Sequence, residues 1–210
     1  MNHRNLICNK NFLNFEEYKP FLQKLIDKNA IILLMICNDI AIRINHIEIL
    51  CKLYSDILEH YKTLSKENKI KYSAKIIDFI VVEDIVYHSR RVIDQIIYAL
   101  WINKVGVQNT ENVAHPIDSI GKYLNQADGQ KIVSELDCFK PFLKDLNNIS
   151  NSYKHSINSF SQIGTDLDIN SKEPSFHSYV FKPNDADVKI DQIELTKNIK
   201  LIFMHFLNCL

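Results

Sequence analysis

The chain has 210 residues, of which 46% are hydrophobic and 24% are charged, proportions that are usual for a globular protein with a buried core. Its 25 basic residues balance its 25 acidic residues. This balance argues against a general electrostatic attraction to nucleic acid or anionic lipid, although it leaves room for a local basic patch. Only 4 glycines and 5 prolines are present, which favours long helices over many short strands.

The 5 cysteines are far apart and form no C-x-x-C pair. This pattern argues against a disulfide framework or a zinc site, and it predicts a reducing, cytoplasmic location. The most apolar run, residues 30–37, is far shorter than the ~20 apolar residues that span a bilayer. Residues 1–15 are polar and asparagine-rich, unlike a signal peptide. We therefore expect no membrane partner.

The first part of the chain predicts three helices. Residues 14–29 form the first, with Asn14 as its cap and Pro20 as an unfavourable position. Residues 30–65 form a long second helix, because apolar residues recur there at steps of three and four. Residues 66–103 form the longest helix, since their apolar pattern runs on without glycine or proline.

The middle of the chain predicts shorter elements. Residues 105–116 read as a loop, and residues 117–124 as a short helix. A connection that contains Asp128 and Gly129 leads to a further helix at residues 138–158, which carries one apolar stripe.

The last part of the chain loses helical periodicity between residues 160 and 187. An aromatic and β-branched stretch predicts a short extended segment near residues 176–182, and residues 186–210 predict a final helix. The fold class is therefore all-α. We expect residues 1–210 to form a single helical domain, an antiparallel bundle with two long core helices.

The segment N-N-I-S-N-S-Y-K-H-S-I-N at residues 147–158 is the most informative one chemically. On a helix its polar members fall along one stripe, formed by Asn147, Asn151, Lys154, His155 and Asn158. Asn151 could orient the imidazole of His155 one helical step away, and His155 could then exchange protons near neutral pH. Lys154 could hold a phosphate. This combination suits RNA cleavage, whereas the simpler interpretation is a solvated helix face.

Three short segments also resemble a known family. Residues 89–101 read S-R-R-V-I-D-Q-I-I-Y-A-L-W, residues 115–117 read H-P-I, and a leucine-asparagine stretch at 146–155 leads to asparagine, two residues, then lysine-histidine. Together they resemble a group of uncharacterised bacterial proteins within the HEPN superfamily (higher eukaryotes and prokaryotes nucleotide-binding). The similarity covers about residues 83–159.

The resemblance implies a helical bundle with an HEPN-like core at about residues 66–159. It also implies a homodimer, since active HEPN nucleases often dimerise and bring two motif copies together in a cleft. Their usual signature is an arginine and a later histidine with four to six residues between them. His155 matches that histidine, and Asn151 matches the polar position between the two.

The arginine of that signature is missing, because Asn148, Ile149 and Ser150 occupy its places. Lys154 is one substitute, and Arg90 and Arg91 from the facing helix are two others. The simplest interpretation of Arg90 is a salt bridge to Asp94, one helical step away.

No metal site or cofactor is predicted. Asp84 and His88 are four residues apart and could begin a metal site. No second ligand pair with firm spacing follows, so an ordinary hydrogen bond is the preferred interpretation.

Two functions stay open. The first is an HEPN-like protein that binds or cleaves RNA without a metal, in a toxin or phage-defence setting. The catalytic residues would be His155 and Asn151, and Lys154, Arg90 and Arg91 would bind substrate. The second is a non-catalytic interaction module, antitoxin-like or regulatory, that binds a protein partner. The missing arginine and the net charge of zero favour this second function.

Overall fold

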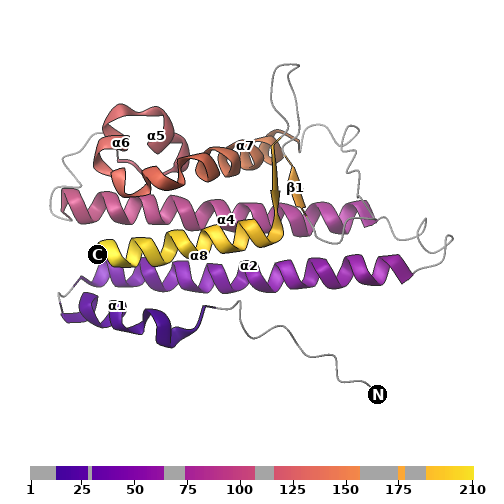
Figure 1. The fold of residues 1–210 in the computed structure, drawn as a ribbon, viewed down its shortest axis with the longest axis horizontal. Coiled ribbons are helices and arrows are strands. Elements are labelled where there is room, and N and C mark those ends of the chain that lie inside the picture. Colours follow the sequence, from indigo (N-terminus) through magenta and orange to yellow (C-terminus); the bar gives the residue numbers. More distant parts are fainter. Residues whose placement is uncertain (1–12, 28–29, 64–73, 107–115, 157–174, 178–187) are drawn as a thin grey trace.

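Helices dominate the computed structural model, which describes residues 13–27, 30–63, 74–106, 116–156, 175–177 and 188–210 (Figure 1). In chain order the elements are α1 (Phe15–Asp27), α2 (Ile31–Thr63), α4 (Ala74–Val105), α5 (Ile120–Asn125), α6 (Ala127–Ile132), the 3-10 helix η3 (Ser134–Phe139), α7 (Lys140–Ser156), β1 (Ser175–His177), β2 (Lys189–Asp191) and α8 (Gln192–Cys209). The all-α prediction is confirmed in these residues, apart from the two short strands.

The two longest helices, α2 and α4, run side by side in opposite directions (Figure 1). Their facing sides are apolar and fully buried, as Ile40 and Ile44 of α2 and Ile85 and Ile96 of α4 show. Such apolar stripes hold long helices together mainly through the removal of their surface from water. The α2–α4 pair therefore forms the centre of the core.

Shorter helices cover this pair. α8 packs against both α2 and α4, and α7 packs against α4 on the side away from α2 (Figure 1). Phe203 and Phe206 of α8 are fully buried. At the start of α1 the Asn14 side chain accepts a hydrogen bond from the Glu16 backbone N–H at 3.2 Å, so the predicted cap is confirmed.

Several boundaries differ from the predictions. The connection expected around Asp128 and Gly129 is the helix α6, and Cys138 belongs to η3 rather than to α7. The last helix begins at Gln192, not at residue 186, because β2 precedes it and the Asp191 side chain caps the new helix through the Glu194 backbone N–H. Gly106 has a φ of 83° directly after α4, which is the helix end expected there.

The extended segment expected near residues 176–182 is found only as far as the structure describes it. β1 pairs antiparallel with β2, and Phe176 lies opposite Ile190. Residues 178–182 lie outside the described residues, as do the expected helix start near residue 66 and most of the loop at 105–116.

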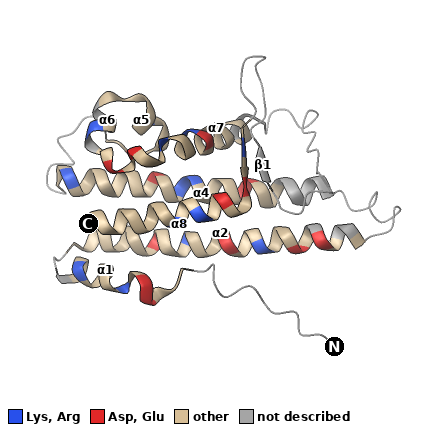
Figure 2. Ribbon diagram, in the orientation of Figure 1, with Lys and Arg blue, Asp and Glu red and all other residues tan. Residues whose placement is uncertain are grey.

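Charged side chains of both signs are interspersed along the helices (Figure 2). Among the helices that the structure describes, none is both long and apolar enough to cross a membrane.

Candidate functional site

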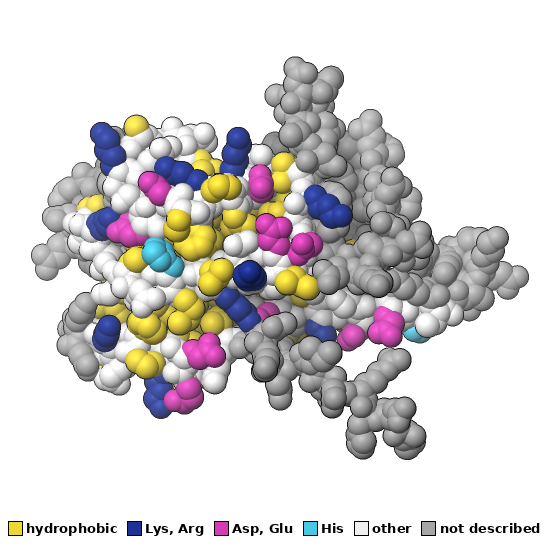
Figure 3. All heavy atoms as spheres, in the orientation of Figure 1, with side chains coloured by type: hydrophobic (Ala, Val, Ile, Leu, Met, Phe, Trp, Pro, Cys, Tyr) yellow, Lys and Arg dark blue, Asp and Glu magenta, His cyan; other side chains and the backbone are white. Residues whose placement is uncertain are grey.

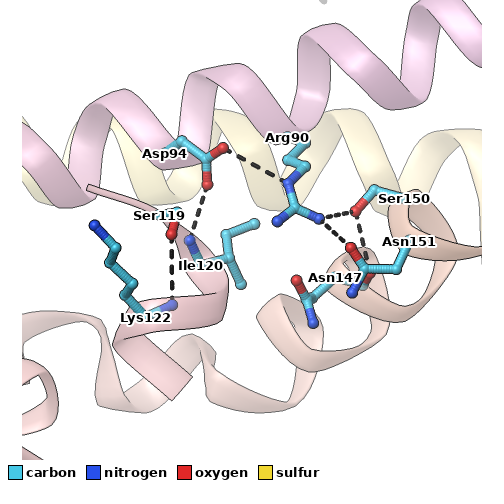
Figure 4. Close-up of polar contacts among 8 residues, drawn as sticks. All are labelled: Arg90, Asp94, Ser119, Ile120, Lys122, Asn147, Ser150 and Asn151. Atoms are coloured by element: carbon cyan, nitrogen blue, oxygen red, sulfur yellow. Dashed lines mark hydrogen bonds and ion pairs between the residues drawn. The ribbon is translucent and has the colours of Figure 1, made fainter. Parts of the chain in front are cut away.

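A polar contact joins α4 to α7, inside the region that the resemblance singles out. Arg90 reaches from α4 to two neighbouring side chains of α7 (Figure 4). Its Nη1 donates to the Ser150 hydroxyl at 2.5 Å and to Asn151 Oδ1 at 2.8 Å. Charge-assisted hydrogen bonds of this kind are stronger than neutral ones, so Arg90 fixes the position of the Asn151 amide.

The other side of the same guanidinium faces Asp94. Arg90 Nε lies 3.6 Å from Asp94 Oδ2, and each of the two side chains is only 12% exposed. The salt bridge predicted from their four-residue spacing is therefore present. Asp94 Oδ1 also accepts a hydrogen bond from the Ile120 backbone N–H at 2.8 Å, so this carboxylate attaches the start of α5 to α4 (Figure 4).

The polar stripe of α7 is partly buried where it meets α4. Ser150 is buried, Asn147 and Asn151 are half-buried, and Asn148 on the adjoining face is exposed. The Ser150 hydroxyl donates to the Asn147 carbonyl at 3.1 Å. Asn147 Oδ1 is buried without a hydrogen-bond partner among the described residues. A solvated helix face therefore does not describe this part of the stripe.

Lys154 and His155 belong to the last turn of α7. Their backbone places His155 one helical step beyond Asn151. The side chains of both residues lie outside what the structure describes, so their predicted roles stay predictions. Asn158, the end of the predicted stripe, also lies outside the described residues.

Arg91 does not join Arg90 at α7. It is exposed, and its positive charge acts on Asp39 of α2. Successive residues of a helix point about 100° apart, because a turn takes 3.6 residues. Of the two arginines expected to line a cleft facing His155, Arg90 contacts α7, whereas Arg91 acts on the α2 side of α4.

A second polar cluster lies between α4 and α2. Asp39 Oδ2 accepts a hydrogen bond from Arg43 Nε at 2.8 Å and another from the Gln95 side chain. Partial burial raises the pKa of Asp39, but these two hydrogen bonds and the charges of Arg43 and Arg91 outweigh it. The pKa of this carboxyl consequently lies below its ordinary value.

His88 belongs to this second cluster. Arg43 Nη1 lies 3.4 Å from His88 Nδ1, and since a guanidinium has only donors, this contact fits a His88 ring whose Nδ1 carries no proton. Burial and the neighbouring His46 and Arg43 lower the pKa of His88, against smaller opposing effects of the carboxylates. Within the described residues, no three His, Cys, Asp or Glu side chains gather where they could hold a metal ion.

Two of the contacts around Arg90 and Asp94 were not predicted. Ser150 was considered only as a place where the motif arginine is missing, and Asp94 only as a salt-bridge partner. The signal for Ser150 was its three-residue distance from Asn147, which places both on the same side of α7. No sequence signal links Asp94 to Ile120, because they are brought together only by the packing of α5 on α4.

The face of the molecule shown in Figure 3 carries no continuous basic patch over the residues that the structure describes. Basic, acidic and hydrophobic side chains alternate on it (Figure 3). An attraction to RNA would therefore come from a few individual basic side chains rather than from the net electrostatic field of the surface.

Comparison with known proteins adds no relative to this picture. No protein-family model, curated protein or solved structure matches the chain.

Proposed function

We propose that this chain is an HEPN-like protein that binds RNA or cleaves it without a metal, with its site at the junction of α4 and α7. The observation that carries the proposal is the pair of hydrogen bonds from Arg90 to Ser150 and Asn151. They bring a guanidinium from α4 to the segment whose own arginine is missing. Arg90 thereby becomes the substitute for the motif arginine, and Arg91 does not.

In this proposal each residue has a separate task. His155 transfers the proton during cleavage, and Asn151 orients it from one helical step away. Lys154 offsets the charge of the phosphate. Arg90 is a positioning residue, since its contacts hold the Asn151 amide in place and add a fixed positive charge behind it.

The test is cleavage of a mixed-sequence, single-stranded RNA by the purified full-length protein in the presence of EDTA. We expect the wild type to cleave and His155→Ala to lose at least about 100-fold in rate, as is typical when a general acid or base is removed. Asn151→Ala should lose less, because it orients the imidazole and does not transfer the proton.

Asn148→Ala is the matched control, since Asn148 is an exposed amide on the same helix. It should cleave like the wild type. Cleavage that survives His155→Ala unchanged would show a contaminating nuclease and would reject the catalytic role. Absence of cleavage by the wild type, with RNA binding retained, would leave the binding function alone.

One observation favours the second function, a non-catalytic helical module that binds a protein partner. The Arg90 side chain is only 12% exposed and is already engaged with three side chains. A guanidinium committed in this way is well suited to holding two helices together. If this function is the right one, the wild type neither binds nor cleaves RNA, and His155→Ala leaves the capture of the partner intact.

A further inference from the structure

One side of α2 exposes a row of large apolar side chains. Ile42 on this side is 58% exposed, and the other members are similarly open to solvent. In chain order the row consists of Ile31, Met35, Ile42, Ile49 and Leu53. We refer to these five residues as the α2 stripe. Exposed apolar residues are common one at a time, but five on the same side of one helix, although exposed Asn38 and His46 lie between them, are typical of an interaction surface.

The spacing of the α2 stripe keeps it on a single side of the helix. Its members follow one another at steps of four, seven, seven and four residues. Steps of four and seven return to nearly the same direction on a helix with 3.6 residues per turn. From Ile31 to Leu53 the stripe is about 33 Å long, at a rise of about 1.5 Å per residue.

The stripe is also symmetric about its middle residue. Met35 and Ile49 each lie seven residues from Ile42, and Ile31 and Leu53 each lie eleven residues from it. In two antiparallel copies of α2 related by a two-fold axis at Ile42, Met35 comes level with Ile49 of the second copy. Ile31 then comes level with Leu53, and Ile42 meets itself. A two-fold interface requires such self-complementarity, whereas an unrelated partner does not.

The polar residues beside the stripe fit the same arrangement. With the axis at Ile42, Asn38 comes level with His46 of the second copy, and Asp39 comes level with Asn45. No two side chains of like charge are level with each other among these flanking residues. Within one copy Asp39 already pairs with Arg43, so its charge is balanced at the rim of the interface. Matching of this kind favours one register over its neighbours.

We propose that two copies of this chain associate through the α2 stripe, antiparallel, with the two-fold axis at Ile42. The proposal does not depend on the RNA function. α7 packs on α4 rather than on the α2 stripe. The contact of Arg90 with α7 would therefore stay within each copy, away from the dimer interface. Such a dimer does not bring the two α7 motifs into a shared cleft.

The first test is the molar mass of the full-length protein in solution, measured by sedimentation from micromolar to submillimolar concentration. We expect a monomer–dimer equilibrium in the wild type. Ile42→Asp places two carboxylates on the axis and should raise the dimer Kd at least about tenfold. Ile193→Asp is the matched control, because Ile193 of α8 is 57% exposed and lies outside the stripe. Unchanged circular dichroism and Tm in both variants would show that they fold.

The second test determines the register directly, by mild oxidation of variants that carry one introduced, exposed cysteine. Cys8, Cys138 and Cys209 are first replaced by serine, while Cys37 and Cys51 are buried and stay. Ile42→Cys should cross-link to itself, since only a residue at the axis meets its own copy. Met35→Cys should not, because its two copies would lie about 21 Å apart along the helices, beyond the Cα separation that a disulfide allows. A mixture of Met35→Cys and Ile49→Cys should cross-link.

Three results would overturn the proposal. The first is a wild-type protein that stays monomeric at every concentration, whether or not it binds to lipid vesicles in a flotation assay. The second is a dimer that Ile193→Asp dissociates and Ile42→Asp does not. The third is self-cross-linking of Met35→Cys, which would mean parallel helices if Ile42→Cys also cross-links to itself, and an axis at another residue if it does not.

Discussion

The helix α4 carries two polar contacts on different sides, and adjacent arginines take part in them. On the α7 side, Arg90 is largely buried and bonds to Ser150, Asn151 and Asp94. On the α2 side, Arg91 is exposed and acts on Asp39 only through its charge. The comparison shows that two like residues at successive positions differ in function because the helix turns between them.

The largest effect on stability is expected when the two arginines are replaced one at a time. Arg90→Met should lower the free energy of unfolding by about 3–5 kcal/mol, because it leaves the Asp94 carboxylate and the α7 acceptors buried without their cation. Arg91→Met should change it by less than about 0.5 kcal/mol, as exposed substitutions usually do. Urea unfolding of both variants at neutral pH measures the difference. Equal effects would mean that the Arg90 contacts contribute little to the fold.

A smaller effect is expected on the α2 side, and it depends on pH. The pKa of His88 is lowered from its ordinary value of 6.5, first by burial and then by His46 and Arg43. The folded state therefore takes up a proton less readily than the unfolded chain. The stabilisation from neutral His88 is complete above 6.5 and is lost as the pH falls below that value.

The comparison with His88→Gln isolates this contribution. Between pH 7 and pH 5, the free energy of unfolding should fall less steeply in His88→Gln than in the wild type. The variant His60→Gln is a control for the general loss of a histidine, because His60 is exposed on α2. If the free energy of unfolding falls equally with pH in the wild type and in His88→Gln, His88 does not contribute to the pH dependence.

The helices themselves were predictable from the sequence. Long apolar patterns placed both ends of α2 and α7, and the C-terminal end of α4, to within a few residues, because the stability of these helices comes from burying one side along the whole length. Local sequence patterns do not predict short elements reliably. α6 has six residues around Asp128 and Gly129, which are typical of turns, and its helical form depends on packing with α5 and η3.

The candidate site was predictable only in part, for a related reason. Asn151 and Arg90 were singled out from separate segments, and their contact depends on how α4 and α7 pack, which no local pattern specifies. The ion pair between Glu48 of α2 and Lys200 of α8 illustrates the same limit. Burial raises the pKa of Glu48 while Lys200 lowers it in part, yet 152 positions of chain (200 minus 48) separate the two residues.

The most direct test of the account is the affinity of a labelled single-stranded RNA for three forms of the full-length protein, measured by fluorescence anisotropy at low salt. The forms are the wild type, Arg90→Lys and Arg91→Lys, which keep the same net charge. A lysine cannot reproduce the planar donor fork that holds Ser150 and Asn151. We predict that Arg90→Lys raises Kd about tenfold and that Arg91→Lys leaves it within about twofold. Equal losses in both variants, or a wild type that does not bind RNA, would contradict it.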